Sequence, residues 1–268
     1  MKKFEDLTFA DHYMFEKVLQ NKEICKELLE RLLKIKIKRL EYPEIEKEIS
    51  PYYESKGVRL DVYVKDTDKV FDVELQNAID ETLDLRTRYY QSILDMDSLI
   101  KGEHYSELPT SYIIFICNFD PFNKDIPIYT FFTKCEEIEN LTLEDKMIKK
   151  MFNAKAYFKE SDIEIKSLLE YISSRKPVDD FTDKIHNLIS KIKKKEVNKR
   201  EYENMNIHDQ DTFYRGKKEG IQQGAYQTKV ETAKKFILMK LPLEQISEGT
   251  GLSLEIVEKL AKEEVVKS

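Results

Sequence analysis

Two carboxylates stand out in the segment 58–76, VRLDVYVKDTDKVFDVELQ, because this segment otherwise alternates regularly between apolar and polar side chains. Such alternation predicts two antiparallel strands that are joined by a two-residue turn at positions 67–68. Counting outward from that turn along both strands places Asp61 directly opposite Glu74. The segment therefore predicts a hairpin that brings two acidic side chains face to face.

Such a pair is unfavourable for stability and suited to binding a cation. Facing residues have Cβ atoms ~4.5–5.5 Å apart, and two unit charges about 5 Å apart repel by about 3 kcal/mol at an effective dielectric constant of about 20. A divalent cation turns this repulsion into attraction, and one or two carboxylates with waters and phosphate oxygens usually hold Mg²⁺. Without a metal, one carboxylate of the pair should have a raised pKa. The alternative is a solvated sheet face on which Arg59 or Arg88 compensates the charge.

The same register sorts the whole hairpin into two faces. One face carries the polar side chains together with one tyrosine, and the other is apolar. The predicted polar face consists of Arg59, Asp61, Tyr63, Asp72, Glu74 and Gln76, and the apolar face of Val58, Leu60, Val62, Val64, Phe71, Val73 and Leu75.

The elements around the hairpin predict an α/β fold with a mixed sheet flanked by helices, followed by a helical region and a small C-terminal helical module. Apolar periodicity near 3.6 residues predicts helices, and short apolar or alternating runs predict strands. The expected helices are 12–34 and 81–102, the expected strands are 44–50, 111–119 and 126–137, and residues 141–198 are expected to be entirely helical.

Residues 206–268 are expected to form the separate C-terminal module. Within it, 243–260 fits a helix-turn-helix pattern, but Glu255 and Glu258 would face the phosphates on the second helix, so association with a protein partner or a second copy explains this module better than base reading. The glycines at 216, 220 and 224 favour either one close-packed helix face or a loose hinge. The basic run 191–200 is either a local DNA contact or a solvated helix face.

Composition narrows the class of protein. The 268 residues carry 45 basic and 51 acidic side chains, so the net charge of −6 provides no overall attraction to nucleic acid or to an anionic membrane. The three cysteines are odd in number and far apart, which favours reduced thiols and a cytoplasmic protein. We expect neither secretion nor membrane insertion, since no long apolar segment is present. The absence of a glycine-rich phosphate loop and of metal-type histidine spacing argues against nucleotide binding and structural zinc.

The strand with Asp61, the hairpin, and the strand with Glu74-Leu75-Gln76 resemble the PD-(D/E)XK nuclease superfamily. More closely, the chain resembles the recombination-promoting nuclease branch of transposase-related proteins. This likeness extends over nearly the whole chain, through ADHYMFEKVL, RTRYYQSIL, KGEHYSELPTSYIIFI and AKKFILMKLPLEQISEGTGLSLEIVEKL.

The resemblance implies a restriction-endonuclease-like domain with a helical extension at 1–205 and metal-dependent cleavage of DNA. It implies that Asp61 and Glu74 bind Mg²⁺ or Mn²⁺, with the carbonyl of Leu75 as a third ligand, and that Gln76 takes the position where many superfamily members have a catalytic lysine. Apart from the resemblance, Arg86, Arg88 and Gln91 on the next helix would reach the DNA phosphates if their face turns toward the hairpin, and the alternative is that the arginines are ordinary surface residues of an amphipathic helix. A nuclease that acts on RNA would share this site. The alternative is a catalytically silent binding protein that keeps the nuclease fold and acts through its C-terminal helices.

Overall fold

The computed structural model describes residues 2–41, 43–49 and 58–265, and within these it leaves out the side chains of 206–219, 222, 223 and 263–265. Contacts divide the chain into two compact units, Met1–Lys199 and Arg200–Ser268, and each is described by itself. The boundary predicted after residue 205 falls inside helix α6 (Glu196–Leu238), which passes from the first unit into the second.

The first unit is built on a six-stranded mixed sheet, which confirms the predicted α/β class. Its spatial order is β1-β2-β3-β4-β6-β5, and only the pairs β3–β4 and β4–β6 are parallel. The strands are β1 (Glu44–Ile49), β2 (Val58–Asp66), β3 (Lys69–Gln76), β4 (Thr110–Cys117), β5 (Ile128–Phe131) and β6 (Met147–Asn153).

The hairpin of β2 and β3 has the predicted register over its inner half. Asp66 pairs with Lys69 beside the turn, and regular pairing continues outward to Val62 and Val73. Beyond that pair the carboxylates of Asp61 and Glu74 take over the backbone hydrogen bonds, as described below. The turn at 67–68 is therefore confirmed, and the ladder changes its character where the acidic residues begin.

Strand β6 contradicts the expectation that residues 141–198 are entirely helical. It lies between β4 and β5 in the sheet, and its consecutive residues Met151 and Phe152, whose side chains point to opposite faces, are both buried. A strand buried on both faces does not alternate. Here its apolar pairs, Met147-Ile148 and Met151-Phe152, imitate the spacing of a helix.

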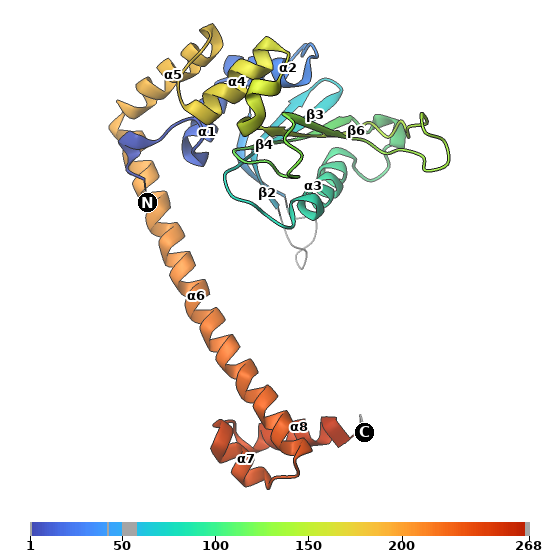
Figure 1. The fold of residues 1–268 in the computed structure, drawn as a ribbon, viewed down its shortest axis with the longest axis vertical. Coiled ribbons are helices and arrows are strands. Elements are labelled where there is room, and N and C mark those ends of the chain that lie inside the picture. The colour runs from blue at the N-terminus through green and yellow to red at the C-terminus, as the bar shows by residue number, and fades with distance from the viewer. Residues whose placement is uncertain (1, 42, 50–57, 266–268) are drawn as a thin grey trace. The chain divides into compact units, whose positions relative to one another are not determined.

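Helices cover both faces of the sheet (Figure 1). Helix α3 (Leu83–Ser98) packs on one face, and α1 (His12–Leu19), α2 (Lys22–Leu33), α4 (Ile163–Ser174) and α5 (Asp180–Lys193) gather on the other side. The predicted helix 12–34 is two helices, because Asn21 interrupts the first and caps the second by accepting from the N–H groups of Glu23 and Ile24. Short 3₁₀ helices occupy Phe4–Asp6, Tyr105–Glu107 and Ala154–Lys159.

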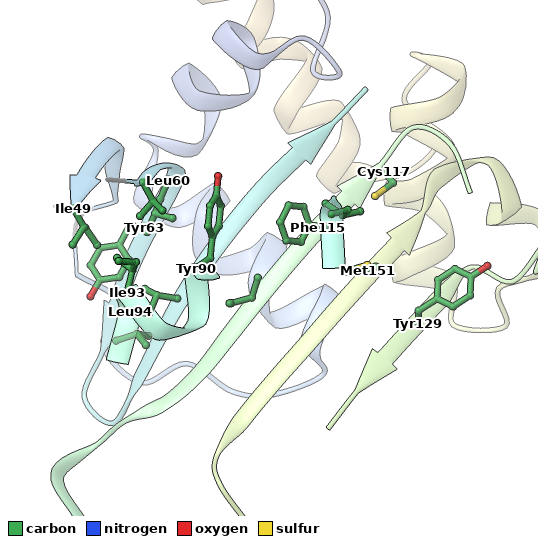
Figure 2. Packing of buried hydrophobic residues seen from close by; sticks show 14 residues of the cluster. Ile49, Leu60, Tyr63, Tyr90, Ile93, Leu94, Phe115, Cys117, Tyr129 and Met151 are labelled. Atoms are coloured by element: carbon green, nitrogen blue, oxygen red, sulfur yellow. The ribbon is translucent and has the colours of Figure 1, made fainter. Parts of the chain in front are cut away.

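The face under α3 contains a buried hydrophobic cluster that includes Tyr90 and Phe115, whose rings stack 6.4 Å apart (Figure 2). Leu60 belongs to this cluster together with Tyr63, although strict alternation would put them on opposite faces. The predicted apolar face is therefore wrong for Val58 and Leu60. The physical reason is a local break in the pairing of β1 with β2 at Asp61, opposite which Glu46 has a left-handed φ of 52°.

The second unit consists of the later part of α6 and two short helices, α7 (Leu243–Thr250) and α8 (Leu254–Val265). Gly251 ends α7 with a φ of 66°, a conformation that favours glycine. A small core joins the helices through Ala233, Ile246, Leu252, Val257 and Leu260. A Cβ added at Gly220 or Gly224 would meet nothing within 4 Å, so neither glycine serves a close helix contact among the described residues.

Candidate active site

Asp61 and Glu74 are locked together by reciprocal hydrogen bonds between side chain and backbone. The N–H of Asp61 donates to Oε1 of Glu74 at 2.8 Å, and the N–H of Leu75 donates to Oδ2 of Asp61 at 3.0 Å. Each carboxylate thus replaces a carbonyl of the ladder as acceptor. These two hydrogen bonds hold the acidic groups side by side through the backbone of the hairpin.

The face that carries these acids is buried, which differs from a solvated sheet face. Glu74 is 2% exposed and Asp72 is fully buried, and the two side chains lie within hydrogen-bonding reach of each other, which requires a proton on one of them. Burial first, and the charge of Asp61 second, raise the pKa of Glu74 to about 7. Burial and the charge of Glu74 raise the pKa of Asp72 well above the usual range of an aspartate. Burial and mutual repulsion therefore favour the protonated forms of these two acids.

Arg86 supplies a permanent positive charge beside Glu74. Its Nη2 lies 3.5 Å from Oε2 of Glu74, and hydrogen bonds to Asp80 at 2.8 Å and to the hydroxyl of Tyr90 at 3.1 Å hold the guanidinium in place. With its amide oxygen turned toward the guanidinium, Gln76 accepts from both terminal nitrogens of Arg86 at 3.2 Å. An arginine from α3 thus provides the charge that Gln76 itself lacks.

Helix α1 adds two residues that we did not predict from the sequence. Nδ1 of His12 lies 3.4 Å from Oδ2 of Asp61, and this contact raises the pKa of His12. One turn further, burial and then the charges of Glu46 and Asp61 raise the pKa of Glu16 to about 8. The available signal was their spacing of four residues, which places both on one face of a helix.

The start of α1 is held beside the end of β3. The side-chain amide of Asn77 donates to the carbonyl of Ala10 at 2.8 Å, which ties the residue after Gln76 to the segment before His12. Residues far apart in the sequence are thereby brought to the same carboxylates.

The other two residues predicted to contact DNA differ in exposure, since Arg88 is exposed and Gln91 is buried. Arg88 is exposed on α3, and within the described part of the chain its side chain forms no ion pair. Gln91 is 3% exposed, and its amide nitrogen donates to Asp95 and to Ser111, so its side chain does not face the surface. In the basic run 191–200, Lys193 donates to the carbonyl of Glu5 and Lys199 pairs with the carboxylate of Glu5.

The donor set fits a hard divalent cation that is held in part by the protein. Within residues 2–41, 43–49 and 58–265, no three His, Cys, Asp or Glu side chains lie close enough together to bind one metal ion. Two adjacent carboxylates are the contribution that Mg²⁺ usually takes from a protein, with waters and phosphate oxygens as its other ligands. The raised pKa values of Glu74 and Asp72 reflect the cost of ionising both acids side by side in a buried place, and a bound cation would offset that cost.

None of the described helices is long and apolar enough to cross a membrane. No curated protein and no solved structure matches the chain. A sequence model of one family, described as PD-(D/E)XK nuclease family transposase, matches residues 3–146. This match spans more than half of the 268 residues and includes the hairpin with Asp61 and Glu74, strands β1 to β5 and helix α3. The chain therefore belongs to the PD-(D/E)XK nuclease family transposases, and its function is of the nuclease type.

Proposed function

We propose that this protein is a divalent-metal-dependent DNA endonuclease that serves recombination or transposition, with Mg²⁺ or Mn²⁺ bound by Asp61 and Glu74. The observation that carries the proposal is the reciprocal pair of hydrogen bonds that holds these two carboxylates together on a buried sheet face. A scaffold selected for stability alone would not keep two acids there at a cost in electrostatic free energy.

The roles of the individual residues follow from their surroundings. Asp61 and Glu74 hold the cation, and the carbonyl of Leu75 would be a third ligand from the same strand. When bound, the cation supplies positive charge for the scissile phosphate and makes the attacking water more acidic. Gln76 would orient that water through its amide, and the positive charge of Arg86 acts to lower the pKa of Glu74, which favours the ionised form that binds a cation.

Arg88 contributes to binding of the substrate. Its guanidinium is exposed on α3, the helix that also carries Arg86, and a guanidinium binds phosphate through several N–H groups. We keep Arg88 as a contact to the DNA backbone and leave out Gln91, because the side chain of Gln91 is engaged inside the protein.

Cleavage of supercoiled plasmid DNA tests the proposal. The wild-type protein should nick or linearise plasmid with Mg²⁺ or Mn²⁺, and a chelator should stop the reaction. Asp61→Ala and Glu74→Ala should abolish cleavage while the circular dichroism spectra remain those of the folded protein. Equal behaviour of wild type and both variants would refute the nuclease proposal and favour a silent binding protein. A parallel assay on structured RNA separates a DNA nuclease from an RNA nuclease.

A further inference from the structure

A groove opens on the surface of α3 next to the carboxylates. It has a volume of about 480 Å³, and its lining includes Val58, Leu85, Arg86, Arg88, Tyr89 and Tyr90. Arg86 belongs both to this groove and to the site, because its guanidinium reaches Glu74. Arg86 therefore links the groove to the proposed site.

The lining combines apolar, aromatic and cationic side chains. Leu85 and Tyr89 are large hydrophobic residues that remain 52% and 36% exposed on adjacent turns of the same helix. Arg88 lies between them in the sequence and lines the same groove. A ligand with a flat apolar ring and a phosphate could pack its ring on Leu85 and Tyr89 and pair its phosphate with Arg88.

We propose that this groove binds one unpaired nucleotide of the DNA substrate, with its base against Tyr89 and Leu85 and its phosphate on Arg88. This inference rests on the proposed nuclease function and narrows its substrate to DNA with unpaired nucleotides beside the cleaved phosphate. Pockets of ~300–1,000 Å³ bind small organic ligands, so the volume of the groove suits a single nucleotide.

The chemistry of the lining argues against an intact duplex as the occupant. A duplex presents phosphates and sugars at its surface, while the faces of its bases are covered by stacking on their neighbours. Phosphate recognition alone would require only cations and hydrogen-bond donors. An aromatic ring beside an aliphatic side chain gains free energy from a base only when that base is unstacked and exposed, as in single-stranded DNA.

Binding without cleavage tests this inference. Fluorescence anisotropy in the presence of a chelator would compare the full-length protein on three labelled probes of the same sequence, which are a blunt duplex, a duplex with a single-stranded overhang, and a single strand of RNA. The variants are Tyr89→Ala and Leu85→Ser, with Tyr89→Phe as the conservative change. Met96→Ala is the matched control, because Met96 is 48% exposed on the same helix and lies outside the groove lining.

We expect Tyr89→Ala to weaken binding of the overhang probe roughly 5- to 100-fold, the range for losing one base stack, and to leave the blunt duplex unaffected. Tyr89→Phe and Met96→Ala should bind both DNA probes as the wild type does. Equal losses on both DNA probes, or no loss on either, would overturn the inference. Tighter binding of RNA with the same dependence on Tyr89 would overturn the assignment to DNA.

The two proposals fail in distinguishable ways. If the wild type cuts plasmid and Asp61→Ala does not, while Tyr89→Ala binds every probe normally, the nuclease proposal stands and the groove inference falls. If the wild type cuts no nucleic acid under any metal, the nuclease proposal falls, whatever the anisotropy measurements give.

Discussion

The guanidinium of Arg86 lies 3.5 Å from the carboxylate of the buried Glu74. It places a positive charge beside Gln76, at the position where many superfamily members have a lysine. The positive charge comes from helix α3 across the face of the sheet, and Gln76 is hydrogen-bonded to it. Asp80 pairs with the same guanidinium, which lowers the pKa of Asp80 to about 2.

Replacing Arg86 should shift the pH dependence of cleavage. The positive charge of Arg86 acts to lower the pKa of Glu74, so its loss in Arg86→Met should raise that pKa further above 7. Because the ionised form of Glu74 is the one that holds a cation, the acid limb of the rate profile should move to higher pH, and Arg86→Lys should move it back in part.

The measurement is the cleavage rate as a function of pH at saturating Mg²⁺. Arg39→Met is a suitable control. Arg39 is exposed, and its backbone N–H donates to Asp66 beside the hairpin turn and not to either carboxylate of the proposed site. An acid limb at the same pH in Arg86→Met and in the wild type would show that Arg86 does not tune Glu74.

Divalent metal should stabilise the folded protein through Asp61. A cation that binds only the folded state raises the melting temperature in proportion to the logarithm of its concentration above the dissociation constant. We expect Mg²⁺ or Mn²⁺ to raise the melting temperature of the wild type and to have no such effect on Asp61→Asn. Asp68→Asn, at the exposed turn of the same hairpin, should respond as the wild type does. A metal response that survives in Asp61→Asn would place the cation elsewhere.

Glu16→Gln should stabilise the metal-free protein at high pH. The pKa of Glu16 is about 8 in the folded protein against an ordinary value of 4.5, so folding favours its protonated form. The stability that protonated Glu16 contributes to the folded protein is fully present below pH 4.5 and is lost as the pH rises to about 8. Glutamine remains neutral throughout, so the variant should melt at the same temperature as the wild type at pH 4.5 and at a higher temperature at pH 8.

Thermal unfolding in a chelating buffer at the two pH values measures this effect. Glu23→Gln, which changes an exposed glutamate of α2, controls for the loss of a carboxylate elsewhere. A lower melting temperature of Glu16→Gln at pH 8 would contradict the electrostatic account of Glu16.

Arg31 should be a structural residue that joins α2 to α5. Its Nη1 lies 2.6 Å from Asp179, and its guanidinium packs 4.4 Å above the ring of Phe181. We expect Arg31→Ala to lower the free energy of unfolding by about 1–3 kcal/mol, because it leaves a partly buried aspartate without its partner. Lys34→Ala removes a more exposed ion pair with Asp162 and should cost only about 0–1 kcal/mol.

The effect of Arg31→Ala should depend on pH. Burial acts to raise the pKa of Asp179, but the N–H of Thr182 and the guanidinium of Arg31 outweigh it and leave that pKa lowered. An aspartate whose pKa is lowered by folding stabilises the protein at pH values above its ordinary pKa of 3.8. This stabilisation is lost as the pH falls through the pKa that the aspartate has in the folded protein. Urea unfolding should therefore show a smaller difference between variant and wild type in acid than at pH 7. A constant difference would indicate that packing on Phe181 dominates.

Local patterns were sufficient to predict the hairpin. The alternation of 58–76 and the position of its turn depend on neighbouring residues alone, and they specify that Asp61 and Glu74 meet. The amphipathic helices after residue 160 were predictable for the same reason, because each has a continuous apolar face. The register of two adjacent strands and the face of a single helix are decided within a short stretch of chain.

Tertiary structure decided what surrounds that hairpin. Burial of the acidic face depends on α3 packing over it, and the strand character of β6 depends on its place between two other strands. The proximity of His12, Glu16 and Arg86 to the two carboxylates depends on segments that no local spacing connects. The sequence by itself determined which two carboxylates face each other, because strand pairing is local, while the fold alone determined their burial and their positive partner, because those contacts join distant parts of the chain.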